Sequence, residues 1–128
     1  MYGIFFCNIF HAQTRNDSAY IHFKDQKYNF GFVEQGKLVK IEYNFKNTGK
    51  SPLLISTIKV TCGCTVADFP HHPIRPGDSG MILITFDTKG KYDRQDRTVD
   101  VISNASNSPA SLRFKGVVLK EKTKKKVP

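Results

Sequence analysis

Hydrophobic and polar residues alternate along most of this chain with a period of two, which is typical of half-buried β-strands. The clearest run lies within residues 38–47, where apolar side chains alternate with lysine, glutamate and asparagine. The sequence NTGKSP at 47–52 follows, and its Asn, Gly and Pro indicate a turn. We predict that this strand faces the core with Val39, Ile41, Tyr43 and Phe45.

Six further segments alternate in the same way, and none shows a sustained helical period. Three prolines forbid regular pairing in the long loop DFPHHPIRPGDSG at 68–80, and DTKGKYDRQD at 87–96 is expected to be a charged connection. The predicted strands lie around 20–23, 28–32, 53–62, 81–87, 99–102 and 112–118. The residues expected to face inwards are Tyr28, Phe30 and Phe32 in the strand at 28–32, Leu54, Ile58, Val60 and Cys62 at 53–62, and Ile82, Ile84 and Phe86 at 81–87. In the last two strands they are Val99 and Val101, and Leu112, Phe114, Gly116 and Val118.

Seven regularly spaced strands separated by turn signals predict an all-β fold, an antiparallel β-sandwich. A chain of 128 residues suits one domain with a single two-layer core. Apolar residues make up 39% and charged residues 24% of the sequence, which is ordinary for a globular chain. Ten Phe, five Tyr and no Trp also favour strands over helices.

The formal net charge is +9, and much of it lies at the C-terminus. The segment LKEKTKKKVP at 119–128 holds five Lys and one Glu, which leaves +5 for the other 118 residues. We expect residues 120–128 to be a solvated, disordered basic tail. No groove-entering helix or aromatic stacking motif accompanies the charge, so we expect no nucleic-acid partner. Weak attraction to an anionic envelope surface is the alternative.

The first twelve residues, MYGIFFCNIFHA, are apolar and carry no Lys, Arg, Asp or Glu. They are too few to cross a membrane, and they resemble the apolar part of a secretory signal that ends near Ala12 and Gln13. A basic start and a small residue at Phe10 are missing. We therefore expect residues 1–13 to be a shortened signal segment, residues 20–119 to be the folded domain, and the protein to be exported. An N-terminal strand packed on the core is the alternative.

The sequence VTCGCT at 60–65 places two thiols one residue apart. Residues i and i+2 of a strand share a face, so Cys62 is expected to point towards the core together with Ile58 and Val60. In a regular strand the Cα atoms of Cys62 and Cys64 would be about 6.5 Å apart, near the upper limit for a disulfide. Closing the ring would need a kink at Gly63. Such a bond would be strained, easily reduced and of little value for stability.

Three interpretations of Cys62 and Cys64 stay open. They are small buried thiols, as free cysteines often are, or they form a disulfide, since an exported protein without its leader would keep only this pair. In the third, they bind zinc or a soft ion such as Cu(I) with His71 and His72, and with Asp68 as a weaker ligand. The spacing matches no zinc motif, so we expect no resident cofactor, with a soft metal ion as the alternative.

Hydrolytic chemistry finds little support in the sequence. Ser79, His71 or His72, and Asp68 could be imagined as a triad, but no nucleophile elbow precedes Ser79. We therefore expect no enzymatic activity, apart from thiol redox chemistry at the two cysteines. The alternation of Phe30, Phe32, Tyr43 and Phe45 predicts core packing and not an aromatic ligand surface.

Three stretches together resemble the domain-of-unknown-function 1573 (DUF1573) family over about residues 23–118. They are FGFVEQGKLVKIEYNFKNTGKSPLLISTIKVTCGCT, PIRPGDSGMILITFDTKG, and VISNASNSP with LRFKGVV. The most specific elements are CGCT, PxxPGxxG at 73–80 and FDT at 86–88. The resemblance implies an immunoglobulin-like sandwich of about seven strands, related to major-sperm-protein and Hydin-type domains. Such domains are common in the envelope proteins of Bacteroidetes-like bacteria. It implies neither an activity nor catalytic residues.

These observations together predict an exported, monomeric immunoglobulin-like module in the periplasm or cell envelope of a bacterium. Its expected role is to bind or scaffold a protein partner, through loops at the ends of the sandwich or through an exposed strand edge. The alternative is a thiol protein in which Cys62 and Cys64 exchange disulfides or carry a soft metal ion.

Overall fold

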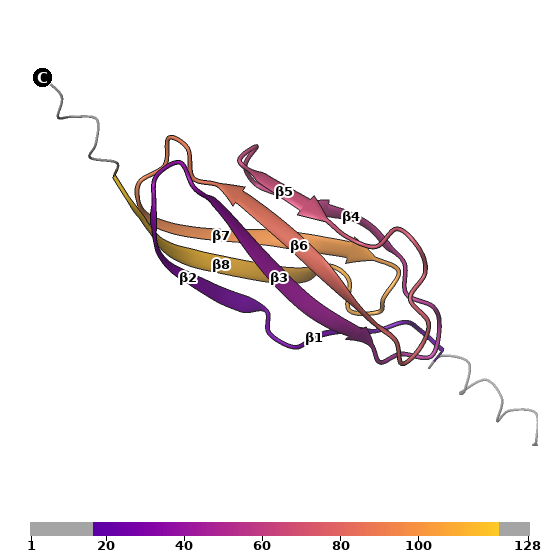
Figure 1. Cartoon of the computed structure of the whole chain (residues 1–128). Coiled ribbons are helices and arrows are strands. Elements are labelled where there is room, and N and C mark those ends of the chain that lie inside the picture. Colours follow the sequence, from indigo (N-terminus) through magenta and orange to yellow (C-terminus); the bar gives the residue numbers. More distant parts are fainter. Residues whose placement is uncertain (1–16, 121–128) are drawn as a thin grey trace, which may run out of the picture.

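The computed structural model describes residues 17–120 as two stacked β-sheets of four strands each (Figure 1). In spatial order, the first sheet contains β1 (Ile21–Phe23), β3 (Leu38–Asn47), β6 (Ser79–Asp87) and β5 (Thr65–Asp68). The second contains β2 (Lys27–Glu34), β8 (Ala110–Leu119), β7 (Asp93–Ser103) and β4 (Ile55–Lys59). The predicted all-β sandwich is confirmed.

Within residues 17–120 there is no helix, and so none that could cross a membrane. The expected signal segment at 1–13 lies outside the described residues, as does the expected tail beyond Lys120.

The core lies between the two sheets, and the predicted inward faces of β3, β6, β7 and β8 are confirmed. Along each of these strands alternate side chains are buried, because successive side chains of a strand point to opposite faces. Phe86 and Phe114 lie at the centre, with ring centroids 5.4 Å apart. The buried residues that were predicted are Val39, Ile41, Tyr43, Phe45, Ile82, Ile84, Phe86, Val99, Val101, Leu112, Phe114 and Val118.

The described residues form eight strands and not seven, because β5 lies between the predicted strand at 53–62 and the predicted loop at 68–80, where no strand was expected. Residues 65–68 pair with β6, with Thr65 opposite Phe86 and Asp68 opposite Leu83. The prolines that argued against pairing begin only at Pro70. The strand is too short for its alternation to stand out, so periodicity alone could not identify it.

Strand β7 begins at Asp93, inside the segment that was expected to be a charged connection. Asp93 pairs with Val118 of β8, and pairing continues to Val101 opposite Ala110. The charged residues Arg94 and Asp96 lie exposed on the outer face, while Gln95 is buried. Charge on one face is compatible with a strand whose other face is covered.

The sandwich is not purely antiparallel, because β2 pairs with β8 in parallel. The chain passes from β1 in the first sheet to β2 in the second through residues 24–26. Figure 1 shows the two strands following one another in the same general direction, so that β2 reaches β8 without a hairpin.

A bulge in β2 reverses the predicted orientation of Phe32. The pairing with β8 skips one residue between Asn29 and Gly31, and Gly31 has a φ of 77°. An extra residue in a strand shifts all later side chains to the opposite face. Phe30 packs on Phe86 as predicted, with ring centroids 5.9 Å apart, whereas Phe32, after the bulge, is 72% exposed. Tyr28, also predicted to face inwards, is exposed as well.

The predicted strand at 53–62 is shorter than expected and also contains a bulge. Its pairing with β7 skips a residue between Ile55 and Thr57, and β4 ends at Lys59. The buried residues are consequently Leu53, Ile55 and Ile58, while the predicted Leu54 and Val60 are exposed.

Candidate functional site

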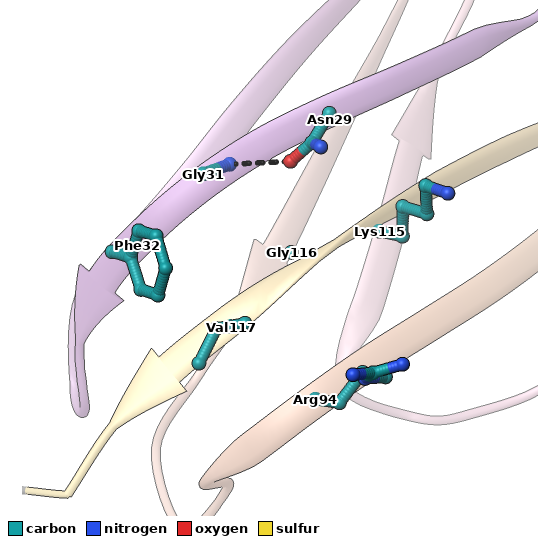
Figure 2. A pocket seen from close by; sticks show the side chains of 7 residues that line it. All are labelled: Asn29, Gly31, Phe32, Arg94, Lys115, Gly116 and Val117. Atoms are coloured by element: carbon teal, nitrogen blue, oxygen red, sulfur yellow. Dashed lines mark hydrogen bonds between the residues drawn. The ribbon is translucent and has the colours of Figure 1, made fainter.

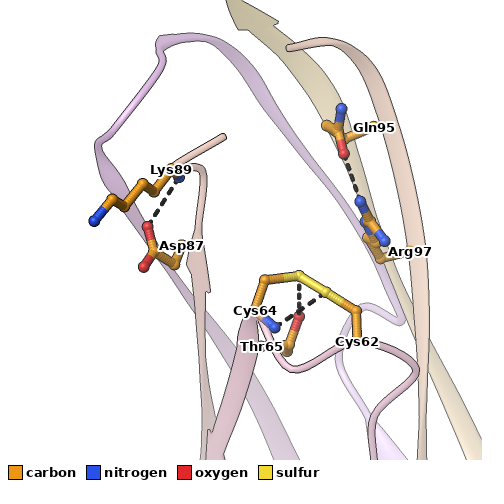
Figure 3. Close-up of a disulfide and its surroundings, with 7 residues drawn as sticks. All are labelled: Cys62, Cys64, Thr65, Asp87, Lys89, Gln95 and Arg97. Atoms are coloured by element: carbon orange, nitrogen blue, oxygen red, sulfur yellow. Dashed lines mark hydrogen bonds between the residues drawn. A yellow bond between two sulfur atoms is a disulfide. The ribbon is translucent and has the colours of Figure 1, made fainter. Parts of the chain in front are cut away.

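Cys62 and Cys64 form a disulfide in the connection that leads from β4 in one sheet to β5 in the other (Figure 3). Their Cα atoms are 5.2 Å apart, because the strand has already ended and the backbone turns. In this turn the Thr65 amide donates a hydrogen bond to the Cys62 carbonyl oxygen at 3.1 Å.

The predicted orientation of Cys62 is therefore wrong. Its side chain is half-buried in a turn and does not project from a strand, and Cys64 packs against the core. The bend that ring closure was predicted to need is present, since Gly63 lies in this turn, and its φ lies outside the left-handed region. No atom lies within 4 Å of the position that a Cβ would occupy there. An alanine would fit at Gly63, and the reducibility of the bond stays a prediction.

Backbone and side-chain donors surround the two sulfur atoms. The Cys64 amide lies 3.1 Å from Cys62 Sγ, and Thr65 Oγ1 lies 3.8 Å from Cys64 Sγ. The Asp87 amide donates to the Cys64 carbonyl oxygen at 2.9 Å and ties the turn to β6. Figure 3 also places Arg97 of β7 in these surroundings. An amide donor beside Cys62 Sγ would stabilise a thiolate there if the bond were reduced.

The structure does not gather the proposed metal ligands. His71 and His72 are both exposed in the loop after β5, and the His71 ring lies tilted against Phe69 with centroids 4.5 Å apart. In the part of the chain that the structure describes, no three His, Cys, Asp or Glu side chains lie close enough together to hold a metal ion.

A second candidate site lies at the end of the sandwich where β8 finishes. Three segments meet there, namely the β2–β3 turn, the β6–β7 turn and the last residues of β8 (Figure 1). The Gln35 amide donates to the Leu119 carbonyl oxygen at 2.9 Å, and Gln35 Nε2 donates to the Lys91 carbonyl oxygen at 2.8 Å. Thr88 Oγ1 donates to the Lys37 carbonyl oxygen at 2.7 Å. These bonds hold the three segments in a fixed arrangement.

This end presents exposed apolar side chains among basic ones, and we call it the apolar–cationic end. The Lys120 ammonium lies 5.4 Å from the centroid of the Tyr92 ring, within reach of a cation–π interaction. The exposed apolar residues are Phe32 (72%), Leu38 (58%), Tyr92 (56%) and Leu119 (45%). The basic residues are Lys37, Lys89, Lys91, Arg94 and Lys120, and three acidic residues, Glu34, Asp87 and Asp93, lie among them.

A hollow of about 270 Å³ lies beside Phe32 on the outer face of the second sheet (Figure 2). Val117 of β8 lies between Phe32 of β2 and Arg94 of β7, because the three residues share one cross-strand row. Asn29 Oδ1 accepts a hydrogen bond from the Gly31 amide at 2.9 Å and helps to hold the bulge. The hollow is lined by Asn29, Gly31, Phe32, Arg94, Lys115, Gly116 and Val117.

Sequence reasoning identified the cysteines but missed the apolar–cationic end. Strict alternation placed Phe32 in the core, although the glycine between Phe30 and Phe32 was a signal for a bulge. The gathering of Lys37, Lys91 and Lys120 depends on the topology, and local sequence patterns do not show it.

A family model described as a protein of unknown function (DUF1573) matches residues 21–118. The chain belongs to the DUF1573 family. The predicted resemblance is therefore confirmed over almost all of the described strands. No curated protein matches the sequence.

Solved structures similar to this DUF1573 domain support the immunoglobulin-like fold. A protein of unknown function from Porphyromonas gingivalis W83 aligns with a TM-score of 0.69 and 19% identity, over 85% of this chain and 51% of its own. The chain thus spans about half the length of that protein. A PapD-like domain of human CEP192 aligns with a TM-score of 0.62 and 12% identity, over 82% of this chain and 89% of its own. The VesB protease of Vibrio cholerae aligns with a TM-score of 0.63 and 13% identity, over 84% of this chain and 34% of its own. At these identities the likeness concerns the fold alone.

Proposed function

We propose that this DUF1573 domain is an exported, non-enzymatic binding module of the bacterial cell envelope. Its contact surface is the apolar–cationic end. The apolar leader-like segment at 1–12 supports export, and an immunoglobulin-like sandwich is a common scaffold for binding.

The exposure of Phe32 is the observation that carries this proposal. A phenylalanine ring that is 72% exposed on a strand does not stabilise the fold by burial in the core, and the bulge at Gly31 holds this ring outwards. Burial of such a side chain by a partner is worth about 1.5–3 kcal/mol. Clustered exposed apolar side chains rimmed by polar ones mark interaction surfaces more often than scattered ones do.

A photo-crosslinking amino acid at position 32 tests the proposal in living cells. We expect an adduct in the native host when Phe32 is replaced, and none when Leu54 is replaced. Leu54 is a suitable control because it is also exposed, at 43%, and directly precedes β4 at the opposite end of the sandwich. Equal labelling at both positions, or none at position 32, would contradict the proposal.

The disulfide favours a second candidate function, thiol–disulfide exchange with a dithiol protein. A partner thiolate would attack Cys64 Sγ, which breaks the bond and leaves Cys62 as a thiolate beside the Cys64 amide. The partner's second thiol would then attack the mixed disulfide. The partner leaves oxidised, and this chain keeps two thiols, having gained two electrons and two protons.

Single cysteine variants distinguish the two candidate functions. If exchange is the function, Cys64 in a Cys62→Ser variant should hold a mixed disulfide that a non-reducing gel detects. If binding is the function, the double Cys→Ser variant should still give the adduct at position 32. Loss of that adduct in a correctly folded double variant would favour exchange.

A further inference from the structure

We propose that the partner of the apolar–cationic end is the anionic lipid surface of an envelope membrane. The domain would stand on the bilayer by this end, with the Phe32 side chain in the interface between headgroups and acyl chains. The inference rests on the proposed function, because it names the partner of the same surface.

The apolar residues suit the boundary between water and lipid. Phe32 is the most exposed large hydrophobic residue in the described part of the chain, and the exposed Leu119 lies two residues beyond Val117, the partner of Phe32 in β8. Tyr92, with an apolar ring and a polar hydroxyl, is of the type enriched at membrane interfaces. These side chains come from segments that hydrogen bonds already hold together, so docking would order little additional backbone.

The charge distribution distinguishes this end from the other. The apolar–cationic end has five basic and three acidic described residues, of which its connections and the residue after β8 supply four basic and no acidic ones. The connections at the opposite end hold two basic residues, Lys50 and Arg75, and two acidic ones, Asp17 and Asp78. Arg75 and Asp78 there form an ion pair at 3.7 Å. An anionic surface would therefore orient the molecule with the β8 end towards it.

The combination of few apolar contacts and many basic residues fits a lipid surface. One or two apolar insertions bind a bilayer weakly, and stable attachment needs a polybasic region as a second signal. Each basic residue held near an anionic surface strengthens binding about fivefold at moderate ionic strength. Here the described basic residues come from the β2–β3 turn, the β6–β7 turn, the start of β7 and the residue after β8, as an extended anionic surface requires.

Vesicle flotation with the full chain tests the inference. We use vesicles of phosphatidylcholine alone, and of equal parts phosphatidylcholine and phosphatidylglycerol. We expect binding to the anionic vesicles that falls steeply between about 0.05 M and about 0.5 M salt. The apolar segment at 1–12 is the same in the parent and in every variant below, so comparing each variant with the parent removes its contribution.

Matched variants locate the contact. Phe32→Ser should weaken the anion-dependent binding about tenfold, whereas Leu54→Ser should leave it unchanged. The double variant Arg94→Glu, Lys120→Glu should weaken the anion-dependent binding at least tenfold. The double variant Lys50→Glu, Arg75→Glu makes an identical charge change at the other end and should weaken this binding far less. Since all six residues are exposed, unchanged thermal unfolding is expected for each variant.

Equal binding to both kinds of vesicle, or equal losses at the two ends, would overturn the lipid inference. The proposed function can survive that result, because an adduct of position 32 with a protein would identify a protein partner at the same surface. The absence of both lipid binding and any adduct would remove the two proposals together.

Discussion

Asn47, at the end of β3, connects three parts of the chain through one buried side chain. Its Nδ2 donates to the carbonyl oxygens of Ser51 and Ile74, at 2.8 and 2.9 Å. Its Oδ1 accepts from the amides of Tyr20 and Gly49, at 3.3 and 3.0 Å. A buried polar side chain is tolerated when its donors and acceptors are satisfied, as they are here.

Replacement of Asn47 should therefore be costly. Asn47→Ala removes the partners of buried backbone groups, each of which costs about 1–3 kcal/mol when left unsatisfied, so we expect a loss of about 2–4 kcal/mol in the free energy of unfolding. Urea denaturation measures it. Asn44→Ala, at an exposed position of the same strand, is the control and should change stability by less than about 0.5 kcal/mol. Similar losses for both variants would refute this role.

Tyr43 should make stability depend on alkaline pH. Burial, and secondarily the nearby Tyr28, raises the pKa of the Tyr43 hydroxyl well above its ordinary value. The hydroxyl donates to the Arg113 carbonyl oxygen at 2.6 Å. The unfolded chain loses this proton above a pH of about 10 while the folded chain keeps it, so the stabilisation is complete below that pH and declines above it.

A Tyr43→Phe variant isolates this effect. It should be less stable than the parent at pH 8, by about 1 kcal/mol for the lost hydrogen bond. The difference should then shrink by up to about 1.4 kcal/mol per pH unit above pH 10, because only the parent has this proton to lose. Denaturant midpoints at pH 8, 10 and 11 are the measurement, and a difference that stays constant with pH would contradict the assignment.

Among the elements, the strands with uninterrupted pleats were predictable and the bulged ones were not. From Val39 to Phe45 in β3 and from Ile82 to Phe86 in β6 every second residue is apolar and buried, so Ile41 and Ile84 could be placed from the sequence alone. In β2 and β4 an extra residue shifts the register, and the partner strand fixes where this happens. Phe32 and Leu54 therefore face solvent although alternation placed them inside.

The same reasoning explains how much of the candidate site could be predicted. The spacing of Cys62 and Cys64 made them visible as a chemical pair, but their position beyond the end of β4 required the strand boundary. The apolar–cationic end depends on contacts between residues far apart in sequence, such as Gln35 with Leu119. Such contacts follow from the topology and leave no local pattern.

The connection that holds the disulfide should contribute little to stability. The bond closes a loop of only three residues, for which the chain-entropy relation gives about 1.6 kcal/mol. We therefore expect the double variant Cys62→Ser, Cys64→Ser to lose no more than about 1.6 kcal/mol in the free energy of unfolding. Thermal unfolding of parent and variant under oxidising conditions measures this, with Gly63→Ala as a control that should be nearly neutral. A loss of several kcal/mol would show that the bridge is essential to the fold.

At the scale of the whole molecule, one topological feature determines where the surface elements gather. The parallel pairing of β2 with β8 brings the end of β2 beside the end of β8, with Glu34 opposite Leu119. Phe32, the β2–β3 turn and the start of the C-terminal lysine-rich segment thereby lie at one end of the sandwich. An antiparallel arrangement would have placed Phe32 away from these lysines.

That parallel pair also has a mechanical consequence. The chain enters through β1 and leaves through β8 at opposite ends of the sandwich (Figure 1), so tension along the polypeptide pulls β2 and β8 in opposite directions along their common axis. The backbone hydrogen bonds between the two strands would be loaded in shear, so that all of them resist the force together and do not break one after another. A domain anchored at one terminus and pulled at the other is thus suited to bear load.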